Sequence, residues 1–370
     1  MFDEQKIREF GKTIGILGKG QNLSRSQTKE CYRQVVLNEQ PELQQGAFLV
    51  AHLIKGPTTM EMAGAWDAMM EYDMEHIAPN TSEPSCDIVG TGSDALKTVN
   101  VSTPAALITS ACGVPMAKKG ARLVTGVSGA SDVLESCGVD LATPLDRVEK
   151  GIEQYGIGYL PGEQFLKSGW SRLITVMRFT TVFNIIGPIT MPCDTTKHIV
   201  IGTFAPDVCT KTIDILREIG MQSAMSMYGM SDDHEENLGI DEISICGPTK
   251  VWELRDKKID SYTLSPSDFG IRQAKYADVV SKDTCEGNAQ AILKVLKGED
   301  EGPLLDLFCA NAAVALHITN KAGSLSQGVD IAKQAVADGT SLEQLRNLVA
   351  NQSSSKEGQE KLERLIQSVG

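Results

Sequence analysis

Several features that would place the chain in a special class are missing from its 370 residues. The nine cysteines never form a CxxC pair, so the sequence predicts neither a disulfide framework nor a structural zinc site. Basic residues are scarce: 35 against 48 acidic ones give a net charge of −13, which disfavours nucleic acid and anionic membranes as partners. Internal repeats and low-complexity tracts are also missing, and an ordinary composition indicates a folded globular protein.

The sequence also lacks a long apolar run. Its longest uncharged segment, residues 98–117, contains Pro104, Pro115 and several hydroxyl and amide side chains, which makes it a poor membrane span. The first residues, MFDEQKIREFGK, are charged almost from the start and do not form the apolar core of a secretion signal. Together with cysteines that fit reduced, buried thiols, these features predict a cytoplasmic protein.

What the sequence does contain is two kinds of hydrophobic pattern. Apolar residues recur at helical spacing over about residues 4–75. Beyond a stretch rich in Pro, Asn and Ser at residues 76–85, short β-rich runs such as CDIVG and KHIVIGTF alternate with helical ones. This alternation predicts βαβ units and an α/β fold, in which helices flank a mainly parallel mixed sheet.

The segment CDIVGTGSDALKTVNVSTPAALITSACG joins an apolar run to many small polar residues. Gly90 and Gly92 follow the expected strand, where backbone without side chains can approach a ligand closely. A dinucleotide-binding fingerprint does not fit, because no third glycine follows at the right place and no acidic residue stands about twenty positions further on. The glycines alone are therefore weak evidence for a site.

The same segment also contains a helix start. Thr103 can cap a helix whose first position is Pro104, with Asn100 and Ser102 beside it at the positive end of the helix dipole. Free backbone N–H groups at such an end attract an anion, although most helix caps bind nothing. A second helix start of this kind would strengthen the interpretation.

The segment AKKGARLVTGVSGASDVLESCG provides that second start. Lys118, Lys119 and Arg122 precede a turn of small residues at 128–131, and the turn opens another expected helix. A pair of lysines in a turn is commonly just solvated. However, cations next to two helix starts are what a pyrophosphate group requires, so the two segments together predict a polyphosphate site.

With these motifs the chain resembles the anthranilate phosphoribosyltransferases, which are related in fold to the pyrimidine nucleoside phosphorylases. GTGSDALKTVNVST corresponds to the family pattern GTGGD...T.N.ST, and AKKGARLVTGVSGASDVLESCG to AKHGNR...SGS.D.LE..G. TTVFNIIGPITMP corresponds to RT.FN.LGPL.NP, and GIDEIS contains the acidic pair of the family as Asp241-Glu242. The four motifs agree in order and spacing, and the resemblance covers nearly the whole chain.

The resemblance implies a magnesium-dependent phosphoribosyltransferase that takes 5-phosphoribosyl-1-pyrophosphate (PRPP) as donor and releases pyrophosphate. Ser102, Asp241 and Glu242 would hold the magnesium ions, whose other ligands are water and phosphate oxygens. No side chain would act as a catalytic nucleophile, because the protein positions the reactants and neutralises the leaving group. The residues implied to bind PRPP are Gly90, Gly92, Asp94, Thr98, Asn100, Ser102, Thr103, Lys118 and Ser131.

On the acceptor side the chain departs from the family. The arginine that grips the anthranilate carboxylate falls on Thr180, and Arg178, two positions earlier, would point to a different face of a helix. The family's histidine falls on Lys119, which we expect to supply the replacing cation. The resemblance thus implies a small, aromatic acceptor without identifying it as anthranilate. The expected acceptor pocket comprises Lys119, Ala121, Thr180, Gly187 and Pro188.

For the chain as a whole we expect an all-helical N-terminal domain over residues 1–80, with a returning helical segment at about 165–184, and an α/β domain over residues 81–370. The resemblance implies a homodimer formed through the helical domain. Two other functions stay open: a pentosyl (nucleoside) phosphorylase of the same superfamily, and a relative without catalysis that binds nucleic acid or a protein. Nucleoside cleavage by phosphate would indicate the first, and steep salt-dependent DNA binding the second.

Overall fold

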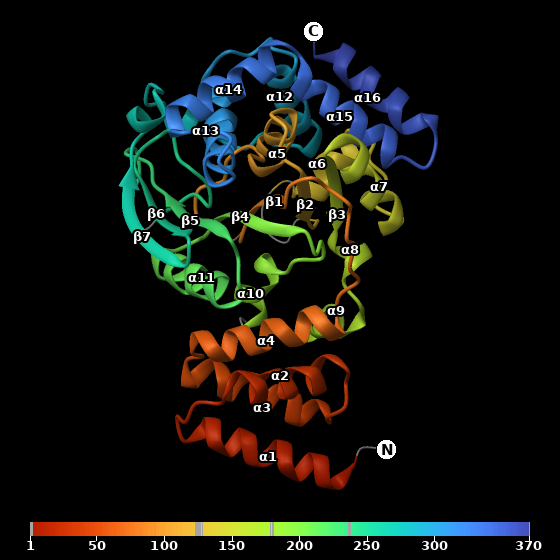
Figure 1. The fold of residues 1–370 in the computed structure, drawn as a ribbon, viewed down its shortest axis with the longest axis vertical. Helices are drawn as coiled ribbons and strands as arrows, with labels where there is room; N and C mark the ends of the chain where they lie inside the picture. Colours follow the sequence, from red (N-terminus) through yellow and green to blue (C-terminus); the bar gives the residue numbers. More distant parts are fainter. Residues whose placement is uncertain are drawn as a thin grey trace. The chain divides into compact units, whose positions relative to one another are not determined.

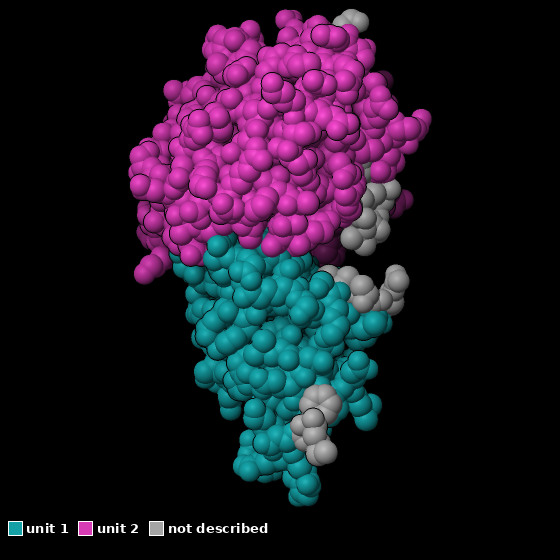
Figure 2. Space-filling view, turned by 90° about the vertical axis from the view of Figure 1, so that its right-hand side faces the viewer, with its two compact units in different colours: residues 1–76, 165–192, 214–220 teal, residues 77–164, 193–213, 221–370 magenta. Residues whose placement is uncertain are grey.

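The computed structural model divides the chain into two compact units, coloured separately in Figure 2. Unit 1 comprises residues 1–76, 165–192 and 214–220, and unit 2 comprises residues 77–164, 193–213 and 221–370. The residues that the structure describes are 3–92, 94–122, 127, 129–177, 179, 181–235 and 238–369, without the side chains of 174 and 175.

Unit 1 is built from helices, as the helical spacing of residues 4–75 predicts. Two of them begin with a capping box: Ser24 pairs with Gln27 at the start of α2, and Thr58 with Glu61 at the start of α4, which satisfies backbone N–H groups there. The elements are α1 Glu4–Gly18, α2 Arg25–Val36, α3 Glu42–Lys55, α4 Thr59–Tyr72, α9 Ser168–Met177, α10 Phe183–Ile186 and a 3₁₀ helix Gly187–Ile189.

A buried polar cluster joins three helices of unit 1. The Glu61 carboxylate accepts a 2.6 Å hydrogen bond from the ammonium of Lys55 and a 2.8 Å bond from the backbone N–H of Leu23. Beside it, the Nδ1 atom of the fully buried His52 lies 3.0 Å from the Tyr32 hydroxyl, and its Nε2 has no hydrogen-bond partner among the described residues. Burial lowers the pKa of His52 to about 4, so the folded protein holds this imidazole neutral.

The low pKa of His52 predicts a loss of stability in mild acid. Between pH 6.5 and pH 4 the unfolded chain binds a proton that the folded chain excludes, so stability is lost as the pH falls through this window. The full effect is about 3 kcal/mol, because the pKa falls from 6.5 to about 4 and each pH unit of this difference counts for about 1.36 kcal/mol. Melting temperatures measured at pH 7 and pH 4.5 should therefore differ less in His52→Leu than in the wild type, and equal differences would contradict the assignment.

Unit 2 contains a sheet of seven strands in the described part of the chain. Its parallel strands are short and almost wholly buried, as expected where helices cover both faces. The strands are β1 Ser85–Gly90, β2 Met116–Gly120, β3 Ile157–Pro161, β4 Thr196–Gly202, β5 Ser223–Gly229, β6 Thr249–Arg255 and β7 Lys258–Leu264.

The strand order is β3-β2-β1-β4-β5-β6-β7. All pairs from β3 to β5 are parallel, whereas β5–β6 and β6–β7 are antiparallel. Gly90 at the end of β1 stands beside Gly202 at the end of β4. The predicted fold class, a mainly parallel mixed sheet with a smaller all-helical N-terminal domain, is confirmed.

Helices pack on both faces of this sheet. In Figure 1, α13 and α14 lie above the strands and α11 lies below them. The main core lies under α13, which is buried over almost its whole length, while Cys209 of α11 packs with Tyr228 and Trp252 on the opposite face. The remaining helices are α5 Ser102–Ala111, α6 Ala130–Ser136, α7 Leu145–Tyr155, α8 Gly162–Phe165, α11 Pro206–Glu218, α12 Cys285–Leu296, α13 Pro303–Ile318, α14 Leu325–Ala337, α15 Thr340–Asn351 and α16 Lys356–Ser368. None of the described helices has the length and apolar character needed to cross a membrane.

Candidate active site

Three adjacent parallel strands, β1, β4 and β5, each end in a glycine, and one loop lies against all three ends. A Cβ atom added at Gly202 would overlap the carbonyl oxygen of Asp241, and one at Gly90 would collide with the Asp241 carboxylate. At Gly229 an added Cβ would lie 2.5 Å from the carbonyl oxygen of Glu242. Because these glycines have no side chains, the loop that carries both acids can approach the carboxyl ends of the strands.

Asp241 and Glu242 contact the segment that follows β1, which the sequence predicts to bind a ligand. The Asp241 carboxylate accepts a 2.7 Å hydrogen bond from the backbone N–H of Gly92. The Thr98 hydroxyl donates a 3.0 Å hydrogen bond to the Glu242 carboxylate. Residues almost 150 positions apart in the sequence are therefore in direct contact at the carboxyl ends of the central strands.

Asp94 adds a third, mostly buried carboxylate, which pairs with Lys97. Burial and the charge of Asp94 raise the pKa of Asp241 to about 7. Burial and the charges of Asp241 and Asp94 raise the pKa of Glu242 well above its usual value. Acids that are crowded in this way suit a divalent cation, which would favour their ionised forms. The described residues hold no ready-made group of three or more His, Cys, Asp or Glu for a metal, so water and substrate oxygens would complete its coordination.

Helix α5 starts two residues earlier than predicted. Its first residue is Ser102 and its cap position is Val101, so the prediction that Thr103 caps the helix is wrong. Asn100 provides the side-chain acceptor instead, because its Oδ1 atom accepts a 3.3 Å hydrogen bond from the backbone N–H of Thr103. Thr103 is 3% exposed, and its buried hydroxyl has no hydrogen-bond partner among the described residues. A buried hydroxyl without a partner at a helix start is suited to a polar ligand.

The two lysines of the second motif lie in strand β2 and are buried, so the alternative of a solvated turn is wrong. The ammonium of Lys119 pairs with the buried carboxylate of Asp87 in β1. The ammonium of Lys118 donates a 2.6 Å hydrogen bond to the backbone carbonyl of Lys119. Burial lowers the pKa of Lys118 to about 8. Among the described residues, Asp87 thus pairs with Lys119 alone, and its charge only partly offsets the effect of burial on Lys118. An anion beside Lys118 would favour its charged form.

The predicted second helix is α6, and it places two further polar residues. Arg122 is half exposed, and its guanidinium bonds the carboxylate of Glu135 at 2.7 Å and that of Asp132 at 3.2 Å. Ser131 is fully buried, with its hydroxyl oxygen 2.6 Å from the hydroxyl oxygen of Tyr159. The acids of α6 therefore balance the charge of Arg122, while Ser131 belongs to the interior.

Other residues that the sequence predicts for the site are not brought together in the structure. Ser102 is half-buried in the first turn of α5, and no described hydrogen bond joins it to Asp241 or Glu242. Of the expected acceptor residues, Ala121 is exposed after β2, and Lys119 is occupied by its ion pair.

The remaining acceptor residues lie in unit 1 or outside the described residues. Gly187 is buried against the ring of Trp170, and Pro188 follows it in the 3₁₀ helix. Thr180 and Arg178 lie outside the described residues, as does Ser128 of the small-residue turn.

The sequence interpretation missed three residues that organise this region. Asp87 is a charged residue in an otherwise apolar strand, and a buried charge requires a partner, so this signal was available. Tyr159 left no local signal, because an aromatic residue in a strand is ordinary core. Tyr276 donates a 2.8 Å hydrogen bond to the carbonyl oxygen of Lys97 and so supports the segment that carries Asp94.

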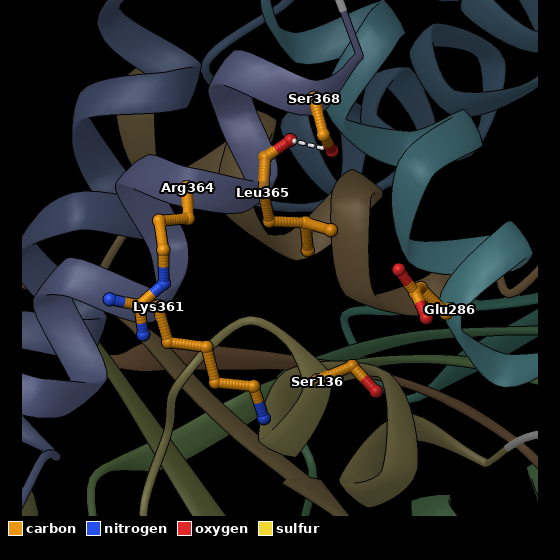
Figure 3. Close-up of a pocket in the computed structure, with 6 residues that line it drawn as sticks. All are labelled: Ser136, Glu286, Lys361, Arg364, Leu365 and Ser368. Carbon is orange, nitrogen blue, oxygen red and sulfur yellow. Dashed lines mark hydrogen bonds between the residues drawn. The ribbon is translucent and has the colours of Figure 1, made fainter.

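A cavity of about 370 Å³ elsewhere in unit 2 shares one residue, Ser136, with the second motif and none with the others. Figure 3 shows its lining side chains, which come from the end of α6, the start of α12 and the length of α16. Among them, the Lys361 ammonium donates a 2.7 Å hydrogen bond to the carbonyl oxygen of Glu135. The lining residues are Ser136, Glu286, Lys361, Arg364, Leu365 and Ser368.

Two models of known protein domains match most of the chain. The model of the glycosyl transferase family a/b domain matches residues 82–342, and that of the glycosyl transferase family helical bundle domain matches residues 12–72. The chain therefore belongs to the glycosyl transferase family, as an enzyme of the kind that the four motifs indicate. Within it, eight curated relatives at 30–36% identity are named anthranilate phosphoribosyltransferase, so the predicted family resemblance is confirmed.

Individual relatives match over nearly their whole length. The anthranilate phosphoribosyltransferase of Methanosarcina acetivorans is 36% identical over 346 residues, covering 92% of this chain and 90% of the relative. The crystal structure of the enzyme (TrpD) from Thermus thermophilus is 29% identical, with a TM-score of 0.81 over 91% of this chain and 98% of that one. The Saccharomyces cerevisiae enzyme in complex with PRPP and Mg has a TM-score of 0.81 at 22% identity, over 95% of this chain and 99% of that chain, which supports the fold.

Proposed function

We propose that this chain transfers the 5-phosphoribosyl group from PRPP to a nitrogen atom of a small aromatic acceptor, with release of pyrophosphate. The observation that carries the proposal is the contact of Asp241 with Gly92 and of Glu242 with Thr98. These contacts bring a pair of acids to a glycine-containing loop that leads into the start of a helix. Such an arrangement offers both a cation site and an anion site to one ligand, as a sugar pyrophosphate with magnesium requires.

Each group in this region has a role in the proposal. The N–H groups at the start of α5, the Thr103 hydroxyl and the Lys118 ammonium would bind phosphate oxygens. Asp241 and Glu242 would hold magnesium, which supplies positive charge to the leaving pyrophosphate. The buried carboxylates fit this ion, because their raised pKa values reflect negative charge that burial leaves poorly balanced. The protein would then stabilise charge as the bond to the anomeric carbon breaks.

Anthranilate is the first acceptor to test, because the relatives at 30–36% identity are named for it. The chain's own residues set a condition on this choice. Lys119, the cation expected to replace the family's arginine, has its charge balanced by Asp87 in the structure. A carboxylate-bearing acceptor would have to compete with Asp87 for this ammonium or use another group.

One pair of measurements tests the proposal. Calorimetric titration with PRPP should show binding that depends on magnesium, and pyrophosphate should be released when an aromatic amine such as anthranilate is added. If nucleosides are cleaved by phosphate and no amine releases pyrophosphate, the chain is instead a pentosyl phosphorylase. Failure to bind PRPP, combined with DNA binding that weakens steeply with salt, would replace the proposal with a non-catalytic binding function.

We also propose that the chain forms a homodimer through unit 1, where helix α3 carries exposed apolar residues. Leu43 is 85% exposed and Ile54 80%, and Val50 between them is 39% exposed. Their spacing of seven and four residues places all three on one face of α3. A row of exposed aliphatic side chains of this kind is typical of an interaction surface.

The dimer proposal predicts that charge on this face separates the protomers. Leu43→Glu combined with Ile54→Glu should convert a dimer into a monomer, because each carboxylate would be buried without a partner in the interface. Light scattering after size-exclusion chromatography measures the change. Val176→Glu, which alters a residue of α9 that is 70% exposed, is the control and should leave the mass unchanged. A monomeric wild type, or a double variant that stays dimeric, would refute the proposed interface.

A further inference from the structure

Tyr159 lies next to two of the residues expected to bind the donor, Lys118 and Ser131. It lies in the middle of β3 and pairs in register with Lys118 of β2, so the two side chains point to the same face of the sheet. Tyr159 is fully buried. Its hydroxyl oxygen lies 2.6 Å from that of Ser131, in the first turn of α6. A strand at the edge of the sheet is thereby linked to one of the expected donor-binding residues.

The surroundings of Tyr159 are fitted to this contact. A Cβ atom on Gly120 would lie 2.5 Å from the Tyr159 hydroxyl oxygen and 3.0 Å from its ring, so the glycine makes room for the phenol. The backbone of Tyr159 is held as well, because the Gln352 side-chain amide accepts a 2.7 Å hydrogen bond from its N–H and donates a 2.8 Å bond to its carbonyl oxygen. The position of the hydroxyl is therefore set by packing on one side and by backbone contacts on the other.

The hydrogen-bond roles in this pair follow from chemistry. Burial raises the pKa of Tyr159, so the phenol stays protonated and can donate. A phenol is more acidic than an aliphatic alcohol and is the better donor of the two. In the described part of the chain, the Ser131 hydroxyl is the one hydrogen-bond partner of the phenol. When Tyr159 donates to Ser131, the proton of the serine hydroxyl is left for another acceptor.

We propose that Tyr159 is a positioning residue for the phosphoribosyl donor: its hydroxyl fixes the orientation of Ser131 so that the serine proton points at a phosphate oxygen. This inference rests on the proposed function and on the part in PRPP binding that the family resemblance implies for Ser131. Tyr159 itself would not touch the donor. Its contribution is to hold one hydrogen-bond donor ready, which avoids the cost of ordering it on binding.

The test is the substitution Tyr159→Phe, which keeps the ring and removes one oxygen atom. Calorimetry with PRPP and magnesium should show a dissociation constant about five- to tenfold higher than that of the wild type, the usual effect of one lost hydrogen bond. Ser131→Ala should raise the constant at least as much. In the double variant the tyrosine change should add nothing further, because its effect passes through the serine.

Controls separate positioning from packing. Tyr262→Phe removes a 2.7 Å hydrogen bond from a half-buried tyrosine hydroxyl to Glu253 at the other side of the sheet, and it should leave PRPP affinity unchanged. A Tyr159→Phe variant that melts at a lower temperature but binds PRPP as tightly as the wild type would overturn the inference. Tighter binding, or additive effects in the double variant, would overturn it too. A wild type that does not bind PRPP would instead refute the proposed function itself.

Discussion

Asp241→Asn combined with Glu242→Gln should abolish magnesium-dependent binding of PRPP, with a loss of affinity of at least about a hundredfold. Amides have nearly the shape of the acids but carry no charge, so they cannot compete with water for a hard divalent cation. Calorimetric titrations with and without magnesium measure the effect. The wild type should lose affinity when magnesium is removed, whereas the double variant should bind weakly under both conditions.

The same variant should fold normally. Each amide keeps the shape of the acid that it replaces and can accept the same hydrogen bond, from the Gly92 N–H at position 241 and from the Thr98 hydroxyl at position 242. A matched control is the double variant Asp300→Asn with Glu301→Gln. These two acids are consecutive in the sequence and lie in the segment between α12 and α13, so their replacement should leave PRPP binding unchanged. Affinity for PRPP and magnesium equal to that of the wild type in the Asp241 and Glu242 variant would remove the metal assignment.

Gly202→Ala should disrupt the site although it removes no functional group. The added methyl group would occupy the place of the Asp241 carbonyl oxygen, and backbone cannot move aside as a flexible side chain can. We expect a loss of about 3 kcal/mol or more in the free energy of unfolding, in the range of severe overpacking. Magnesium-dependent PRPP binding should fall in parallel, because the displaced loop carries Asp241. Denaturant unfolding and calorimetry measure the two effects.

The control for this substitution is a glycine with free space around it. Gly15 in α1 has no atom within 4 Å of an added Cβ, and its φ is not positive. Gly15→Ala should be neutral or should stabilise the helix by about 0.5–1 kcal/mol. If Gly202→Ala unfolds and binds PRPP like the wild type, the close contact between the end of β4 and the acidic loop is not required.

Periodicity in the sequence was sufficient to predict the fold, because both domains follow simple rules. Apolar residues at helical spacing predict the helices of unit 1, and alternating strand and helix patterns predict a mainly parallel sheet. The predicted loop after β1 and the acidic pair at 241 and 242 do meet in the structure. In a sheet of parallel strands with right-handed crossovers, the carboxyl ends of neighbouring strands lie side by side. Residues that follow these ends therefore come together even when they are far apart in sequence.

Contacts between strands were out of reach of this reasoning. Lys118 and Lys119 stand next to glycine in a polar stretch, and only the pairing of β2 with β1 shows that Asp87 lies close enough to form an ion pair with Lys119. The helix boundary at α5 was missed for a local reason. Asn100 competes with Thr103 for the capping role, and sequence alone does not show which side chain reaches the free N–H group.

Gln352 has a consequence for the behaviour of the whole sheet. β3 is an outermost strand, and such a strand normally offers a row of unpaired backbone groups on which a foreign strand can build. At the middle of β3, the side-chain amide of Gln352 hydrogen-bonds both the backbone N–H and the carbonyl oxygen of Tyr159, as the backbone of a neighbouring strand would. β7 is the outermost strand on the other side of the sheet, and it carries the charged residues Lys258 and Asp260, which disfavour pairing with a strand of another molecule. A single side-chain amide at the end of α15 therefore leaves fewer unpaired backbone groups on β3 to which a strand of another molecule could pair.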